Sequence, residues 1–271
     1  MLKVNDLSVT SLETITAFGL TSGDYLFTLD ELQNATIANT QETTDVTGKG
    51  GRLLNTLKRN KAVTVSGTNG LLSGGLMEIQ TGSTFNETDT EVRWTDYLTV
   101  KEESSAMKAT TSYKAIGTAG AEIIGLYVKN EDGTLGAKLE QDSAAAAGKF
   151  AYAPATKTLT FDADDVADGD EIVVFYDRKI NANVLANDSD KFSGKAKLYV
   201  DAFAEDKCGN IYRVQFYIPK ADFSGEFSLD LGGDQSVHAF EARGQAGACG
   251  KAAGGNLWTY TIFGVDAADA T

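Results

Sequence analysis

The densest group of potential metal ligands in the chain is the acidic stretch DADDVADGDE at residues 162–171. Clustered carboxylates suit a hard cation such as calcium. The spacing does not fit an EF-hand loop, because counting from Asp164 the third position is Val166 and the twelfth is Phe175. A solvated acidic turn before an apolar strand explains the stretch better, so we predict no metal site. The carboxylates concerned belong to Asp162, Asp164, Asp165, Asp168, Asp170 and Glu171.

The sequence contains no recognisable set of residues for nucleophilic or acid–base catalysis. His238 is the only histidine, which excludes a metal site built on a histidine pair, and its setting Ser-Val-His-Ala-Phe is typical of a strand face. No serine lies in a G-x-S-x-G elbow. The glycine-rich stretches at 48–51 and 73–75 lack the Lys-Ser/Thr of a phosphate-binding loop. We therefore predict no catalytic residue, no cofactor and no enzyme.

The charge balance of this 271-residue chain is strongly acidic, with 38 acidic against 24 basic residues and a net charge of −14. Such a surface repels phosphates, so the chain is poorly suited to gripping nucleic acid. It suits a protein that must stay soluble before assembly, or one that lines a conduit to which DNA must not stick. Hydrophobic residues at 42% and charged residues at 23% are ordinary for a globular protein.

Export and membrane signals are not recognisable in the sequence. The N-terminal stretch MLKVNDLSVTSLETITAFG has no apolar segment or cleavage motif of a secretory signal, and no window approaches about eighteen uninterrupted apolar residues. We expect a protein that is made in the cytoplasm and has no membrane anchor. Cys208 and Cys249 could form a disulfide, although two free thiols are the expectation in that compartment.

The elements that must position any functional surface are strands. Residues 196–203, 211–219 and 225–231 each alternate apolar with polar side chains, which is the period of a half-buried strand. Turn residues separate the three segments. The pattern predicts an antiparallel meander, to which a last strand at 257–263 is added.

One short helix and one basic segment stand out in the first third of the chain. Residues 71–80 predict a helix whose Leu72, Leu76 and Ile79 share a face. Residues 40–51 have the threonine, glycine, aspartate and lysine composition of a loop. Five of the 24 cations lie in and after this loop, and on so acidic a chain they predict a patch that meets an acidic surface. They are Lys49, Arg52, Lys58, Arg59 and Lys61.

Residues 119–180 predict a unit of their own. Strands at regular spacing, separated by turns, indicate a small Ig-like or extended β insertion. Residues 1–118 and 181–271 would form one β domain around it. Residues 101–190 carry 9 cations against 16 anions, which favours an outward-facing position for the insertion.

Two stretches resemble the tail tube (major tail) proteins of tailed bacteriophages. One is TGKGGRLLNTLKRNKAVTVSGTNGLLSGGLMEIQTG at residues 47–82. The other is VDAFAEDKCGNIYRVQFYIPKADFSGEFSLDLGGDQSVHAFEARGQAG followed by LWTYTIFG. Together they cover about half of the chain and carry no catalytic motif. The insertion at 119–180 departs from the shortest members of that family, which lack it.

The resemblance implies a mainly β fold, an antiparallel β-sandwich or barrel of the phage tail-tube type, with the short helix and the small β insertion added. It also implies hexameric rings that surround a lumen and stack through a long loop and the chain termini. Lys49, Arg52, Lys58, Arg59 and Lys61 would belong to that loop and meet acidic side chains of the next ring. The implied function is that of a structural tail-tube subunit, through whose lumen DNA passes without specific binding.

The partners that the resemblance implies are other copies of the chain and other tail proteins: the sheath if the tail contracts, the tape measure, the baseplate and the terminator. The implied location is the virion tail, after assembly in the host cytoplasm. Two alternatives stay open, a capsid decoration or head-associated protein and a glycan-binding β module. Tyr127, Tyr152 and Tyr176 are the candidate platform for a glycan, although core packing explains them better.

Overall fold

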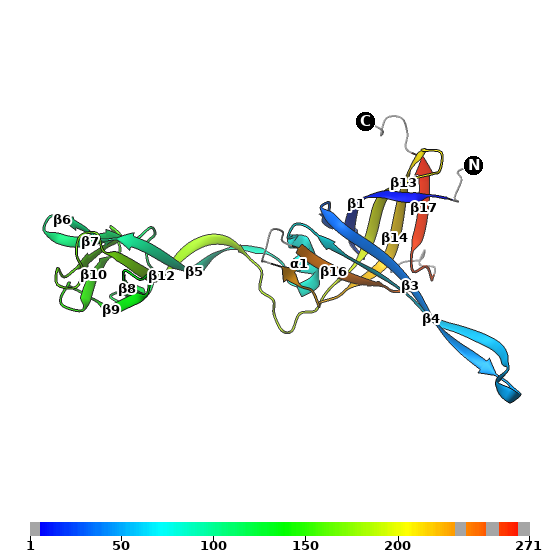
Figure 1. Cartoon of the computed structure of the whole chain (residues 1–271), viewed down its shortest axis with the longest axis horizontal. Coiled ribbons are helices and arrows are strands. Elements are labelled where there is room, and N and C mark those ends of the chain that lie inside the picture. The colour runs from blue at the N-terminus through cyan, green and yellow to red at the C-terminus, as the bar shows by residue number, and fades with distance from the viewer. Residues whose placement is uncertain (1–5, 231–236, 248–254, 265–271) are drawn as a thin grey trace. The chain divides into compact units, whose positions relative to one another are not determined.

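A computed structural model of the chain describes residues 6–230, 237–247 and 255–264 (Figure 1). The chain divides into two compact units. Unit 1 consists of Met1–Phe85 and Leu185–Thr271, and unit 2 is the intervening segment, Asn86–Val184. Both units are built mainly of strands, as predicted, and the described residues contain a single α-helix.

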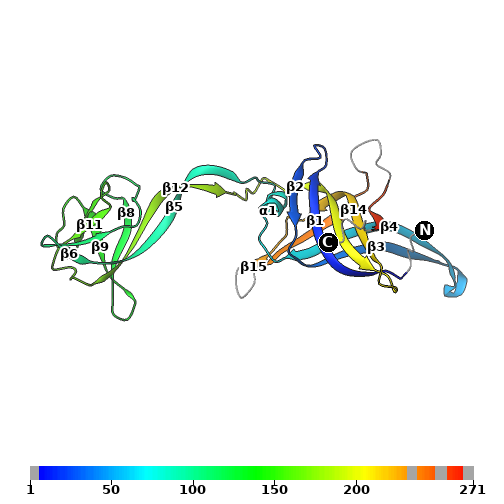
Figure 2. The ribbon, with the colours of Figure 1, turned by 90° about the horizontal axis from the view of Figure 1, so that it is seen from above.

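Nine strands form the sheet of unit 1, in the order β2-β1-β13-β14-β16-β4-β3, with β15 paired to β16 and β17 paired to β14. The sheet curls, so that strands from both of its ends contribute to one core (Figure 2). The bounds are β1 (Ser8–Gly19), β2 (Tyr25–Leu29), β3 (Leu32–Thr47), β4 (Leu53–Asn69), β13 (Lys195–Glu205), β14 (Ile211–Phe223), β15 (Leu229–Asp230), β16 (Val237–Gly244) and β17 (Thr259–Gly264).

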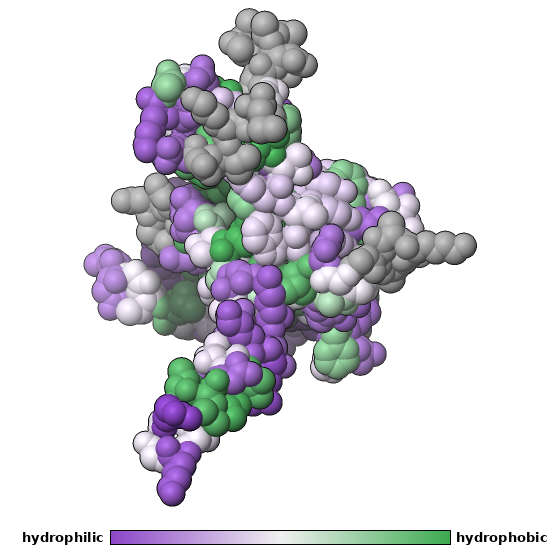
Figure 3. Space-filling view, turned by 90° about the vertical axis from the view of Figure 1, so that its right-hand side faces the viewer, coloured by the Kyte–Doolittle hydropathy of each residue, from purple (hydrophilic) through white to green (hydrophobic). Residues whose placement is uncertain are grey.

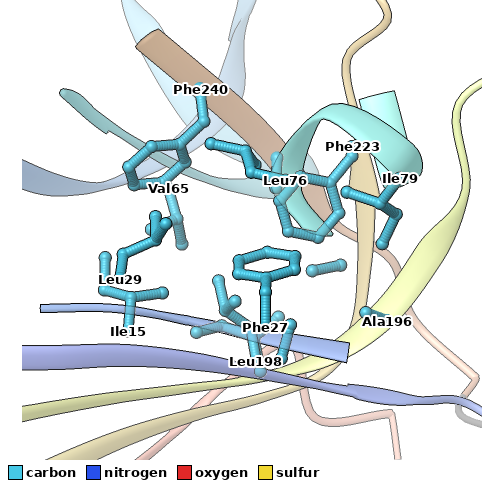
Figure 4. Close-up of a cluster of buried hydrophobic side chains, with 14 of the residues drawn as sticks. Ile15, Phe27, Leu29, Val65, Leu76, Ile79, Ala196, Leu198, Phe223 and Phe240 are labelled. Atoms are coloured by element: carbon cyan, nitrogen blue, oxygen red, sulfur yellow. The ribbon is translucent and has the colours of Figure 1, made fainter. Parts of the chain in front are cut away.

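The core of unit 1 is made by the apolar side chains that alternate along these strands. Every second residue of β13 is buried, from Ala196 to Ala204, as its period-two pattern predicts. In the core the rings of Phe27 and Phe223 meet edge to face with 5.8 Å between their centroids, in the same cluster as Leu76 of the helix (Figure 4). The curled sheet and the helix therefore share one apolar interior.

The helix α1 (Gly74–Thr81) packs on this core. Ser73 caps its first turn, because the Ser73 hydroxyl accepts a hydrogen bond from the backbone N–H of Leu76. Leu76 and Ile79 are buried, as predicted for the apolar face. Leu72 lies before the helix and is exposed, so the predicted face is one residue smaller than expected.

A buried histidine ties α1 to β16. His238 is fully buried, and its Nδ1 accepts a hydrogen bond from the backbone N–H of Ser73 at 3.3 Å. Its Nε2 lies 2.8 Å from Gln80 Oε1, so Nε2 carries the proton and the ring is neutral. The Gln80 amide nitrogen donates in turn to the Ala239 carbonyl at 3.0 Å. His238 thus lies on a strand face, as predicted, and burial lowers its pKa.

The closing part of unit 1 differs from the predicted meander. The sequence predicts a third strand over 225–231, but within the described residues only Leu229–Asp230 is strand, and it pairs with β16 rather than with β14. The local sequence predicts a strand around His238 but neither its bounds nor its neighbours, and β16 lies between β14 and β4 and pairs with β4 from His238 to Gly244. The last predicted strand is confirmed, since β17 pairs with β14 in antiparallel register.

Unit 2 contains an eight-stranded sheet in the order β5-β12-β8-β9-β10-β11-β7-β6, with β9 and β10 parallel. It begins earlier than the insertion predicted at 119–180, because β5 pairs with β12 along the whole of both strands. The bounds are β5 (Asn86–Thr99), β6 (Lys101–Glu103), β7 (Ala106–Thr110), β8 (Ile123–Lys129), β9 (Leu135–Asp142), β10 (Lys149–Ala153), β11 (Thr158–Phe161) and β12 (Glu171–Val184).

A buried carboxylate organises one end of the core of unit 2. Asp96 accepts hydrogen bonds from the Tyr176 hydroxyl at 2.7 Å, from the Ser112 backbone N–H and hydroxyl at 2.7 and 2.8 Å, and from Trp94 Nε1 at 2.9 Å. Burial by itself would raise the pKa of Asp96, but these donors together hold it below its ordinary value. Burial and the Asp96 carboxylate raise the pKa of Tyr176.

We expect unit 1 to lose stability as the pH falls below about 6.5, the ordinary pKa of histidine. The folded state holds the pKa of His238 below that value, so the unfolded chain binds the proton first and acid favours unfolding. Urea unfolding at about pH 7.5 and about pH 5.5 measures the difference. In the variant His238→Gln the free energies of unfolding at the two pH values should differ less. An unchanged difference would contradict this role of the histidine.

Candidate assembly surface

The strands β3 and β4 continue beyond the sheet of unit 1 as a two-stranded projection, which we call the arm and define as residues 40–61 (Figure 1). Within the described residues the outer part of the arm pairs only with itself, from Glu42 opposite Arg59 to Thr47 opposite Leu53. Both outer edges of this ribbon are therefore without a strand partner in the described residues.

The arm corrects the loop that the sequence predicts over 40–51. Strand β3 continues to Thr47, because threonine and valine favour the extended backbone and β4 pairs its amide and carbonyl groups. Only the tip is a turn. There Gly50 and Gly51 have φ of 75° and 77°, and the Gly48 N–H donates to the Arg52 carbonyl at 2.8 Å.

All five cations of the predicted patch lie on the arm, and all are exposed: Lys49, Arg52, Lys58, Arg59 and Lys61. The arm carries only two carboxylates, those of Glu42 and Asp45. None of the five forms an ion pair within the described parts of the chain, and Arg59 donates instead to the Thr44 hydroxyl at 2.7 Å. Their charges are thus available to another molecule.

The arm also exposes four large aliphatic side chains that the sequence analysis missed. Leu53 and Leu54 are each 56% exposed, Leu57 is 49% exposed and Val46 is 39% exposed. Figure 3 shows them as a hydrophobic patch on an otherwise hydrophilic projection. The signal was present in the run RLLNTLKR, whose leucines have no place in the core of unit 1.

The strand register places Leu57 and Val46 on the same face of the arm. Leu57 lies opposite Thr44, and Asn55 lies opposite Val46, so each pair shares a face. The register is irregular between Val46 and Thr47, where Leu54 has no partner of its own among the described strands, so the alternation of the strand does not carry Leu53 to the face of Leu57. The four exposed aliphatic side chains therefore lie close together in the outer part of the arm, with the cations of the same strand around them.

The other sequence candidates serve local structure. The acidic residues at 162–171 accept backbone hydrogen bonds, for example Asp168 from Glu102 N–H and Asp170 from Ala167 N–H. Within the described residues no three His, Cys, Asp or Glu side chains gather as a metal site. Tyr152 and Tyr176 are buried in the core of unit 2. Cys208 is exposed, and Cys249 lies outside the described residues.

The sequence model of the YomU/Tube protein family matches residues 8–257. The chain belongs to the YomU/Tube protein family. This confirms the resemblance to phage tube proteins, and the match includes the arm and all of unit 2. No curated protein matches the chain at a significant level. Among the described helices of this YomU/Tube protein, none is long and apolar enough to cross a membrane.

The exposed leucines of this YomU/Tube chain should contribute little to the stability of the isolated subunit. We expect Leu53→Ser with Leu57→Ser to change the free energy of unfolding by less than about 0.5 kcal/mol each, because surface substitutions are nearly neutral. The matched control Leu76→Ala removes a fully buried leucine and should cost about 3 kcal/mol. Urea unfolding compares the two. A large loss in the arm variant would show that the arm packs within its own subunit.

Proposed function

We propose that this protein is the structural subunit of a phage tail tube, in which copies form hexameric rings that stack around a DNA-conducting lumen. The observation that carries the proposal is the arm, an exposed apolar and cationic ribbon on a chain of the YomU/Tube family. On this proposal the protein resides in the virion tail, and its partners are other copies and the neighbouring tail proteins. Its role is structural rather than catalytic.

The arm is suited to joining one ring to the next. A two-stranded ribbon by itself is marginally stable in water, so a surface that covers it stabilises it. Its cations favour an acidic partner, and other copies of a chain with net charge −14 provide one. Burying a leucine side chain contributes about 1.5–3 kcal/mol, whereas an exposed ion pair contributes about 0–1 kcal/mol. We therefore assign most of the stacking energy to the leucines and the choice of partner to the cations.

The outward side of β3 and β4 suits the wall of a DNA conduit. Across these two strands, Asn34 lies opposite Thr68 and Thr36 lies opposite Ser66, and the Asn34 amide donates to the Thr68 hydroxyl at 2.9 Å. Thr64 continues the row of short, uncharged polar groups. These side chains of β3 and β4 carry no cation to hold a phosphate, and Arg243 of β16, opposite Thr64, is paired with Glu241, so we expect DNA to slide past this surface.

The free edges of the sheet suit the joint between neighbours in a ring. β2 and β3 are the end strands of the path through unit 1. An exposed strand edge is a template for pairing with another chain, and a closed ring leaves no edge unpaired. On this proposal, edge pairing would join neighbouring subunits within a ring, and the arm would join subunits of successive rings.

Negative-stain electron microscopy of the purified protein tests the proposal. We expect rings with a central hole wide enough for a DNA duplex, and tubes of stacked rings at higher protein concentration. A persistent monomer or trimer, or a protein that binds only to capsids, would refute the tail-tube function.

Variants of the arm test its role in stacking separately from ring formation. We expect the double variant Leu53→Ser with Leu57→Ser to form rings but no tubes. Charge reversal at Arg52, Lys58 and Arg59 should give shorter tubes. Tube length by microscopy and sedimentation rate measure both effects.

The control for charge reversal changes the net charge of the chain by the same amount, but at residues outside the arm. Lys101, Lys114 and Lys138 are exposed lysines of unit 2, and their replacement by glutamate should leave tube length unchanged. Equal shortening in the two charge variants would mean that net charge, rather than the arm, controls stacking.

A further inference from the structure

Arg178 of β12 is held between two aromatic rings in unit 2. Its Cζ lies 4.6 Å from the centroid of the Trp94 ring and 3.5 Å from that of Tyr113. The two rings meet nearly at right angles, with 5.1 Å between their centroids. A guanidinium is attracted to the face of an aromatic ring, so its position and plane are set before any ligand arrives.

This guanidinium has no anionic partner in the described residues. Arg178 takes part in no hydrogen bond or ion pair with them, and its Nε is buried without an acceptor. The nearby carboxylates are already engaged. Asp96 accepts four hydrogen bonds from other groups, and Asp177 forms an ion pair with Arg93 at 2.5 Å.

We propose that Arg178 is the anchor of an oxyanion-binding site that takes a carboxylate or a phosphate group. A guanidinium offers parallel N–H donors whose spacing matches two oxygens of such a group, and a fixed guanidinium loses little freedom on binding. Nε is the one nitrogen of Arg178 that is buried without a partner, so the two terminal nitrogens reach solvent. They are the donors available to the ligand.

Further positive charge lies beside this position. Lys157 Nζ donates to the carbonyl of Ser112 at 3.1 Å, and Lys114 follows Tyr113 in the chain and is exposed. Unit 2 has 10 cations against 18 anions in its sequence, so a group of cations is not typical of its surface. Two lysines close to Tyr113, together with Arg178, favour an anion over a neutral ligand.

Fluorescence of Trp94 can report binding, because the ring touches the guanidinium. The full-length variant Trp258→Phe leaves Trp94 as the one tryptophan. It is titrated separately with acetate and with inorganic phosphate, while chloride keeps the ionic strength constant. We expect a saturable change in emission with at least one of them, and the responding ion identifies the group that the site prefers.

Two variants and one control assign the response to Arg178. Arg178→Lys keeps the charge but loses the planar fork, and should weaken binding at least about tenfold. Arg178→Gln should abolish binding. Lys101→Gln removes an exposed cation of β6 in the same unit and keeps the Arg93–Asp177 ion pair, and should leave the response unchanged.

A readout that needs no substitution guards against misfolded variants. The Arg178 Nε–Hε resonance of the unaltered chain should shift on titration with the same midpoint as the Trp94 emission. No saturation with either ion, or equal responses in the parent and both Arg178 variants, would overturn the proposal. Because the site lies within unit 2 and the test uses unassembled protein, its failure would leave the tail-tube function untouched.

Discussion

The pairing of backbone amides and carbonyls is the constraint on which the rest of this structure depends. Most of the described strands satisfy it within a wide sheet, but in two ribbons the described strands pair only with each other. One is the arm, and the other is formed by residues 86–92 of β5 and 178–184 of β12. A two-stranded ribbon is marginal in water unless something covers it. The exposed leucines of the arm are consistent with that requirement.

Buried polar groups fix how the two cores close. His238 joins the cap of α1 to β16 in unit 1, and Asp96 joins two strands and the loop at Ser112 in unit 2. Each is satisfied by several partners, and removing one partner would leave a buried group unpaired. Such networks select one arrangement among the many that would bury a similar apolar area.

Charge is distributed to serve contacts rather than folding. The chain has a net charge of −14, yet among the residues that the structure describes the five cations of the arm form no ion pair and Arg178 has no anionic partner. Exposed ion pairs contribute about 0–1 kcal/mol each, so neither feature is needed to keep a subunit folded. For both we propose a role in binding other molecules: a further copy of the chain at the arm, and an oxyanion at Arg178.

The sequence by itself determined the fold class and the family, because strand alternation and turn chemistry are local properties. The alternation of β13, the buried face of α1 and the last strand β17 all followed from residues close together in the chain. The cations of the arm were equally visible. Their role in stacking is still a prediction.

Only the tertiary structure decided which segments become partners. Residues 40–47 have the composition of a loop but form a strand, because β4 supplies the pairing that local propensity does not. β16 is a strand because β4 and β14 flank it, and unit 2 begins at Asn86 because β12 returns to pair with β5. The same long-range pairing placed Arg178 beside Trp94 and Tyr113. Contacts between residues so distant in sequence leave no periodic signal, so the unpaired guanidinium emerged only from the fold. The leucines of the run RLLNTLKR were visible in the sequence, but only the fold showed that they lie outside the core.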